Sequence, residues 1–190
     1  MKKDNIISFF IIIVITVVFC TSLESRHEWF GEYQDGLHQW LTGSSLKFTQ
    51  YWQDKGPWTV CFLLLENPES LEFATISDRI PYLSYPPGTI IPLYLLSVIF
   101  LTDVTLDLIM GVNLANQFFI AILLGIIVYR ILVEVHIGRL EAILYSVTAS
   151  SIGLLLHSMQ YWFQNIYWAD QAVIFPFVGF IFVEILNDCS

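Results

Sequence analysis

Four long apolar stretches dominate the pattern of hydrophobic and polar positions along the chain. The first two have roughly the 20 residues that a helix needs to cross the hydrocarbon core of a bilayer, about 30 Å thick. The last two are shorter, near 16 residues, and need help from their flanks or a thin membrane. The pattern predicts an all-α integral membrane protein with four transmembrane helices, at residues 6–23, 108–133, 141–156 and 172–186.

The first stretch follows two lysines, Lys2 and Lys3. A cleaved signal peptide also begins with basic residues, but it has a shorter apolar core and small residues before the cut. Here Val18, Phe19 and Cys20 precede Thr21, which makes a poor cleavage site. The sequence therefore predicts an uncleaved anchor helix over residues 1–23, with its N-terminus in the cytoplasm.

A further apolar stretch, residues 89–102, could be mistaken for a span. Short loops rich in lysine and arginine remain in the cytoplasm, and the linker after residue 133 carries Arg139, with Arg130 just before it. Both arginines are cytoplasmic only if 89–102 does not cross. Its length of about 14 residues also suits an interfacial or re-entrant helix. We therefore expect one membrane domain, 1–190, in which an external loop, 24–107, carries juxtamembrane helices and precedes a three-helix part, 108–190.

Composition agrees with a membrane protein. Hydrophobic residues make up 56% of the chain and charged residues 13%, with a mean hydropathy of +0.65, whereas soluble domains carry about 25% charged residues. The net charge is −9, and residues 24–107 hold eleven acids against four bases. This loop lacks the basic face that nucleic-acid binding needs, so no nucleic-acid partner is expected. The apolar composition of the chain makes the lipid bilayer its expected partner. The three cysteines form no CxxC pair, which predicts neither a disulfide framework nor a zinc site.

Acidic residues from two separate segments share the external face in this topology. One group, Glu28, Glu32 and Asp35, follows the first span, and Asp170 lies at the mouth of the fourth span in an aromatic loop. Carboxylates from separate segments can bind a hard divalent cation such as Mg²⁺ or Mn²⁺, or act as general bases. The alternative is that these acids are simply solvated.

Three amide side chains, Asn113, Asn116 and Gln117, lie on one face of the second predicted span. Their spacing of three and four residues places them together on a helix. They either form hydrogen bonds between helices or line a substrate groove. The sequence leaves both readings open.

The order of these features resembles the N-terminal module of GT-C fold glycosyltransferases. The likeness rests on "EYQDGLHQWLTG" in the external loop, on "YPPG" before the short apolar helix, and on "WADQAVIFPF" at the last span. This family includes the catalytic subunit of oligosaccharyltransferase, the protein O-mannosyltransferases and the lipid A aminoarabinose transferase. The resemblance implies a sugar donor linked to a polyprenyl phosphate or pyrophosphate at the external face.

The resemblance also implies roles for individual residues. Asp35, with Glu32 next, matches the acid that acts on the acceptor or binds metal, and Asp170 matches the second acid. Tyr85, at the start of "YPPG", and Trp168 are then expected to bind substrate, together with Asn113, Asn116 and Gln117. Asp35 and Asp170 are the expected ligands of a divalent cation.

The expected function is thus that of the N-terminal part of a membrane glycosyltransferase. Members of the family are considerably longer and have more spans, so a further segment or membrane chain is expected to complete the donor cavity. The alternative is a non-catalytic small membrane protein that binds a lipid or a partner protein through its aromatic external loops.

Overall fold

The computed structural model describes residues 2–31, 39–65, 81–82, 87–167 and 169–188, and this part of the chain is all-helical apart from one isolated bridge between Leu65 and Pro81. It confirms the predicted helical class. Within the described residues, seven α-helices and two short 3-10 helices follow in the order α1 (Lys2–Glu24), η1 (His27–Trp29), α2 (Gln39–Lys55), η4 (Pro87–Thr89), α3 (Ile91–Phe100), α4 (Leu106–Glu134), α5 (Arg139–Leu155), α6 (His157–Asn165) and α7 (Ala169–Asp188).

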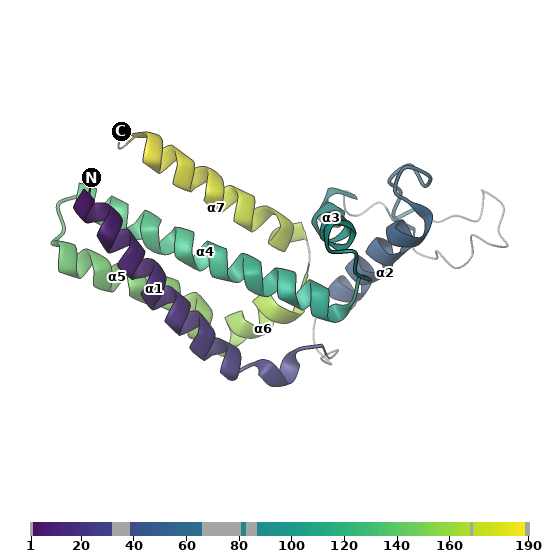
Figure 1. The fold of residues 1–190 in the computed structure, drawn as a ribbon, viewed down its shortest axis with the longest axis horizontal. Helices are drawn as coiled ribbons and strands as arrows, with labels where there is room; N and C mark the ends of the chain where they lie inside the picture. The colour runs from purple at the N-terminus through teal and green to yellow at the C-terminus, as the bar shows by residue number, and fades with distance from the viewer. Residues whose placement is uncertain (1, 32–38, 66–80, 83–86, 168, 189–190) are drawn as a thin grey trace.

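Helices α1, α4, α5 and α7 run alongside one another as an elongated bundle (Figure 1). The beginning of α1, the turn between α4 and α5, and the end of α7 lie at one end of the bundle. Helices α2 and α3 lie at the other end. Successive long helices therefore run in opposite directions, and each matches one of the four apolar stretches of the sequence.

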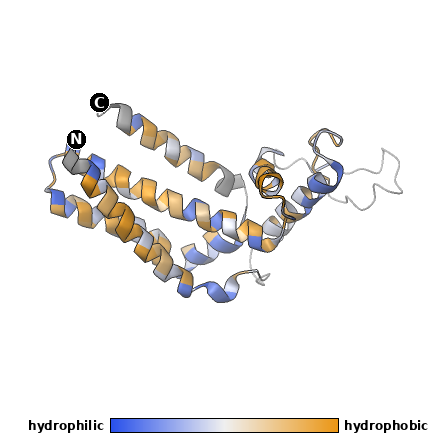
Figure 2. Ribbon diagram, in the orientation of Figure 1, coloured by the Kyte–Doolittle hydropathy of each residue, from blue (hydrophilic) through white to orange (hydrophobic). Residues whose placement is uncertain are grey.

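Two of these helices are long and apolar enough to cross a membrane. They cover Asn5–Glu24 and Leu106–Glu134, and a third crossing results if α5 and α6 form a single span bent by 65°. The apolar part of α7, Val173–Ile185, and helix α3 are shorter. Figure 2 shows hydrophobic residues along α1 and α4, whereas hydrophilic residues gather on α2 and near η1. The chain is thus an all-helical candidate membrane protein with two or three spans by length and composition.

Helix α3 does not run with the bundle. Figure 1 shows it nearly end-on, so it lies across the direction of the long helices. The helix has only ten residues, with Pro92 in its first turn, and it ends where Leu101 adopts a left-handed conformation (φ 50°). Its position in the membrane interface remains a prediction, but its length and direction differ from those of the long helices.

Close packing of α1, α4 and α5 depends on a glycine. A Cβ atom on Gly125 would lie 2.6 Å from Cδ1 of Ile15 and 2.9 Å from Oγ of Ser150. Small residues allow helix backbones to approach closely within a membrane. The contact brings three helices around a core whose fully or nearly fully buried members are Ile11, Ile15, Ala121, Tyr129, Ala142 and Leu154.

A second core lies at the α2–α3 end. The indole of Trp52 is fully buried, and its Nε1 donates a 3.0 Å hydrogen bond to the carbonyl of Leu63. Side-chain amides of α2 also hold the segment between α3 and α4, since Gln50 donates to the carbonyl of Val104 and Gln53 to that of Thr102. The described parts of residues 39–105 thus form a packed unit rather than an extended loop.

The break between α5 and α6 is not apparent from the sequence. The apolar pattern leaves residues 157–171 as the aromatic loop between the last two predicted spans, but His157–Asn165 form a helix that turns from α5 by 65° at Leu156. A break in a helix leaves backbone carbonyls without intrahelical partners. Side-chain amides of α4 and α6 bind two of these carbonyls, those of Gly153 and Leu154.

Candidate functional site

Most of the residues predicted to act in catalysis lie outside the described part of the chain. Glu32 and Asp35 are among them, and so are Tyr85 and Trp168, which are predicted to bind substrate. Asp170 belongs to the first turn of α7, but its side chain is not described. Their catalytic, substrate-binding and metal-binding roles therefore remain predictions. Among the described residues, no group of three or more His, Cys, Asp or Glu side chains is placed to hold a metal ion.

The three amides of α4 separate into two groups. Asn113 and Gln117 are buried and face other helices. Nδ2 of Asn113 donates 3.1 Å hydrogen bonds to the carbonyls of Gln164 and Ile166, at the end of α6. Nε2 of Gln117 donates a 3.0 Å hydrogen bond to the carbonyl of Gly153 in α5. Of the two readings that the sequence leaves open, these two residues follow the first, because they form hydrogen bonds between helices.

The amides compensate for the α5–α6 break. Gln117 binds the carbonyl of Gly153, and Nε2 of Gln160 in α6 donates to the carbonyl of Leu154 at 2.9 Å. Both carbonyls belong to the last turn of α5, which has no intrahelical donors for them. Irregular backbone at membrane depth is tolerated only where the protein satisfies its polar groups. This amide cluster therefore allows α6 to turn away from α5.

A buried cation, the guanidinium of Arg26, is hydrogen-bonded to one of these amides. Arg26, just past α1, has only 1% of its surface exposed. Its Nη1 donates to Oε1 of Gln117 at 2.7 Å and its Nη2 to Oγ of Ser22 at 2.9 Å, while the guanidinium lies over the ring of Phe19. No ion pair to Arg26 occurs within the residues that the structure describes. Burial lowers the pKa of Arg26 to about 10, because desolvation disfavours its charged form.

Asn116 faces a different environment from its two neighbours. It lines a groove of about 480 Å³ between α3, α4 and α7. This volume lies within the range of about 300–1,000 Å³ that is typical of small-molecule sites. The lining is largely apolar and comprises Leu96, Phe100, Asp107, Leu108, Gly111, Val112, Ala115, Asn116, Phe119 and Phe175.

Asp107 is the ionisable residue of this groove lining, and the sequence patterns assign it no role. It belongs to the first turn of α4, after the N-cap Thr105. A Cβ atom on Gly31 would lie 2.5 Å from Oδ1 of Asp107, and Gly31 has a φ of +78°. The backbone after η1 therefore passes directly beside this carboxylate. The carboxylate of Asp107 thus lies beside both the backbone that follows η1 and the apolar groove.

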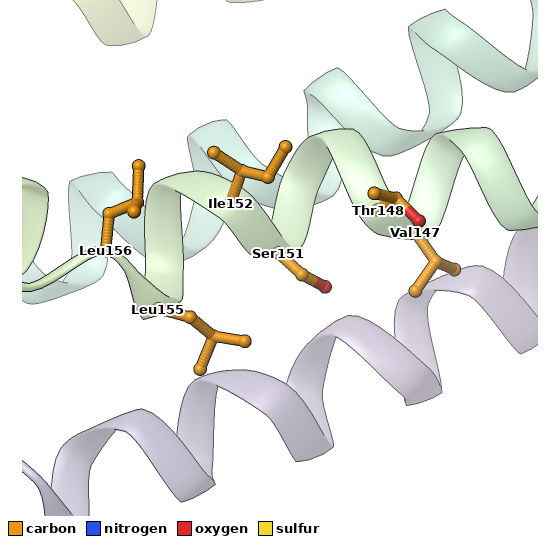
Figure 3. A pocket seen from close by; sticks show the side chains of 6 residues that line it. All are labelled: Val147, Thr148, Ser151, Ile152, Leu155 and Leu156. Carbon is orange, nitrogen blue, oxygen red and sulfur yellow. The ribbon is translucent and has the colours of Figure 1, made fainter.

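A second hollow, of about 360 Å³, lies along α5 (Figure 3). Ser151 and Leu155 point toward α1, whereas Ile152 and Leu156 point to the other side of α5. The hollow is lined by residues of α5 and by Leu156 just after it, and most of its surface is apolar. It carries no ionisable side chain among its lining residues. These lining residues therefore offer no group for acid–base catalysis or for binding a metal ion.

Comparison with known proteins gives no relative for this chain. No protein-family model matches it, and no curated protein or solved structure is significantly similar to it.

Proposed function

We propose that this chain contributes the amino-terminal part of a membrane glycosyltransferase, which takes a sugar from a polyprenyl-phosphate-linked donor at the external face. The observation that carries the proposal is the apolar groove between α3, α4 and α7, with a carboxylate at one edge. A lipid-linked donor needs an apolar site for its tail next to polar residues for its head group.

The groove would hold part of the polyprenyl tail. Phe100, Phe119 and Phe175 supply aromatic surface from three helices, and Asn116 supplies a polar group within the lining. Of the three amides of α4 that are expected to bind substrate, Asn116 is the one that lines this groove. Asn113 and Gln117 would support the site indirectly, because their side chains fix α5 and α6 against α4.

The predicted acids would supply the chemistry. Asp35 or Glu32 would deprotonate or orient the acceptor, and Asp170 would assist or hold a Mg²⁺ or Mn²⁺ ion. Gly31, which directly precedes the segment with Glu32 and Asp35, lies against Asp107 at the edge of the groove. This contact supports placing that segment near the head group of a lipid in the groove.

The proposed membrane arrangement has four spans: α1, α4, α5 together with α6, and α7. The N-terminus, the α4–α5 turn and the end of α7 would lie in the cytoplasm. This is supported by their position at one end of the bundle (Figure 1) and by the basic residues near two of them, Lys2, Lys3, Arg130 and Arg139. Residues 24–107 would then lie outside, and a further segment or membrane chain would complete the donor cavity.

Two measurements test the proposal, and the first uses the purified chain in lipid nanodiscs. A polyprenyl phosphate with a photoreactive diazirine in its tail should crosslink to peptides from α3, α4 and α7, mapped by mass spectrometry. Gly111→Phe, which fills the groove, should reduce this labelling, whereas Gly179→Phe on α7 should not, because Gly179 is open to its surroundings but does not line the groove. Labelling that is spread evenly over all helices would contradict the tail site.

The second measurement addresses catalysis. The assembled protein, with any partner chain that copurifies, is assayed for sugar transfer with Asp35→Asn and Asp170→Asn introduced together. We expect turnover to fall to background. Turnover equal to that of the unmodified protein would remove both residues from the proposed mechanism.

The apolar groove also favours a second candidate function. A groove formed by helices alone can bind a lipid without any catalytic carboxylate, as a small non-catalytic membrane protein would. In that case the two Asp→Asn changes leave function intact, whereas Gly111→Phe, which fills the groove, abolishes lipid binding. Where the contact is made by the aromatic loop instead, replacing Trp162 and Trp168 by alanine abolishes it. The same variants therefore separate the two functions.

A further inference from the structure

The charge at the edge of the groove restricts which lipid can occupy it. The lining includes one carboxylate, Asp107, and no lysine, arginine or histidine. Asp107 is exposed, and no hydrogen bond or ion pair to its carboxylate occurs within the described part of the chain. A purely anionic head group placed here would meet a like charge, whereas a cationic group would be attracted.

The length of the groove indicates where such a head group would lie. Its lining extends along α4 from Asp107 to Phe119, which are 12 residues apart by their numbers (119 − 107). At 1.5 Å per residue this is about 18 Å, close to the roughly 15 Å of hydrocarbon in one leaflet of a bilayer. A chain that fills the groove would therefore place its head group at the level of Asp107.

The surroundings of Asp107 also limit access to its carboxylate. The backbone at Gly31 covers one side of it so closely that no side chain would fit there. Asp107 belongs to the first turn of α4 and lines the groove. A ligand in the groove can therefore reach this exposed carboxylate.

We infer that the groove selects a lipid with an amine-bearing, zwitterionic head group, which places one hydrocarbon chain between α3, α4 and α7 and its ammonium against Asp107. The source of this lipid is the surrounding bilayer. The inference rests on the proposed function in one respect, namely that a lipid tail occupies this groove. It makes the bilayer lipid a competitor of the polyprenyl donor, because the phosphate of the donor would meet the like charge of Asp107 unless a bound cation offsets it. It adds the chemical class of the head group and a specificity-determining residue.

The test uses two photoreactive phospholipids with identical diazirine-bearing chains, one with an ethanolamine head group and one with a glycerol head group. Each is incorporated into nanodiscs with the full chain, and crosslinks to groove peptides are quantified by mass spectrometry. Partly exposed ion pairs contribute about 0.2–1 kcal/mol. We therefore expect the ethanolamine lipid to label the groove about 1.5- to fivefold more than the glycerol lipid.

Three variants isolate the role of the charge. Asp107→Asn should bring the labelling ratio to about one, and Asp107→Glu should preserve the preference. Asp103→Asn removes another exposed acid that does not line the groove, and it should leave the ratio unchanged. If Asp107→Asn does not fold, the ratio in the unmodified protein and in Asp107→Glu still decides the question.

The possible failures are distinguishable. Equal labelling by both lipids within the groove of the unmodified protein would overturn the head-group inference but support the tail site. A ratio that stays unchanged in Asp107→Asn while thermal stability falls would mean that Asp107 only stabilises the start of α4, which also overturns the inference. If neither these phospholipids nor the polyprenyl probe labels the groove, the tail site itself fails, and with it the proposed function.

Discussion

Arg26 and Gln117, which are 91 residues apart in the sequence, are joined by a 2.7 Å hydrogen bond from Nη1 to Oε1. Gln117 passes the connection on, since its Nε2 donates to the carbonyl of Gly153. One glutamine in α4 therefore links the end of α1 with the last turn of α5. Burying a charge without a carboxylate partner is costly unless neutral groups form hydrogen bonds to it. The amide of Gln117 is such a group for the guanidinium of Arg26, so Gln117 is a central contact of the bundle.

Replacing Gln117 by leucine should destabilise the protein markedly. The change removes a hydrogen bond to the charged Arg26, and such bonds contribute about 1.5–3 kcal/mol. It also leaves the carbonyl of Gly153 without its donor. We expect a loss of stability in this range, measured as the unfolding free energy in mixed micelles titrated with a denaturing detergent.

Asn116→Leu is the matched control, because Asn116 is the adjacent amide and faces the groove. Its effect on stability should be within about 0.5 kcal/mol, as for other positions without buried partners. Equal losses in the two variants would mean that the Arg26–Gln117 contact does not stabilise the bundle.

Gly125→Val should weaken the packing of α1 against α4 and α5. The added carbons would meet side chains of Ile15 and Ser150, whose nearest atoms lie 2.6 Å and 2.9 Å from the Cβ position. Overpacking of this kind typically costs about 1–3 kcal/mol. The same substitution at Gly179, where no atom lies within 4 Å of the Cβ position, should have little effect. Identical melting temperatures for both variants would contradict the close crossing at Gly125.

The sequence was sufficient to predict the long helices but not the polar contacts between them. Apolar runs at 6–23, 108–133, 141–156 and 172–186 correspond to α1, α4, α5 and α7. Such runs are visible because a helix surrounded by lipid needs apolar side chains all around it. Helix α6 was missed because its residues, "HSMQYWFQN", are mixed polar and aromatic. Its glutamines at positions 160 and 164 share the four-residue spacing of Asn113 and Gln117, and this is the signal that could have indicated a helix.

The candidate site was harder to predict. In the sequence Arg26 is only one of four bases in residues 24–107, and Asp107 only an acid at the end of that segment. Burial of the first and the groove beside the second depend on contacts between residues far apart in the chain. Asn116 and Gln117 are adjacent in sequence but face different surroundings, because one α-helical step of about 100° separates their directions.

Tyr167→Phe tests the junction between α6 and α3. The hydroxyl of the buried Tyr167 donates a 2.9 Å hydrogen bond to the carbonyl of Thr89, just before α3. Losing this bond should cost about 0.5–1.5 kcal/mol at neutral pH. Burial raises the pKa of Tyr167 above its ordinary value near 10, because desolvation disfavours the phenolate.

The pH dependence of this difference has a defined sign. A raised pKa in the folded state gives stability that is fully present below the unfolded-state pKa, about 10, and is lost as the pH rises beyond it. The stability advantage of the unmodified protein over Tyr167→Phe should therefore shrink above about pH 10. Unfolding free energies of both proteins at pH 8 and at higher pH measure this. A difference that stays constant across this range would mean that the phenol is not protected from ionisation.

The orientation of α4 across the membrane can be measured with cysteine labelling. Cys61 is exposed in the turns that follow α2, and Val135, 62% exposed, lies in the turn between α4 and α5. Helix α2 and the turn between α4 and α5 lie at opposite ends of the bundle (Figure 1). In a background with Cys20 and Cys189 replaced by serine, a membrane-impermeant maleimide should label Cys61 in intact cells. With Cys61 also replaced, Val135→Cys should be labelled only after the membrane is permeabilised, since the basic residues near it favour the cytoplasm.

The reverse pattern would invert the proposed orientation and move the groove edge at Asp107 to the cytoplasmic side. Labelling of both positions in intact cells would mean that α4 does not cross the membrane.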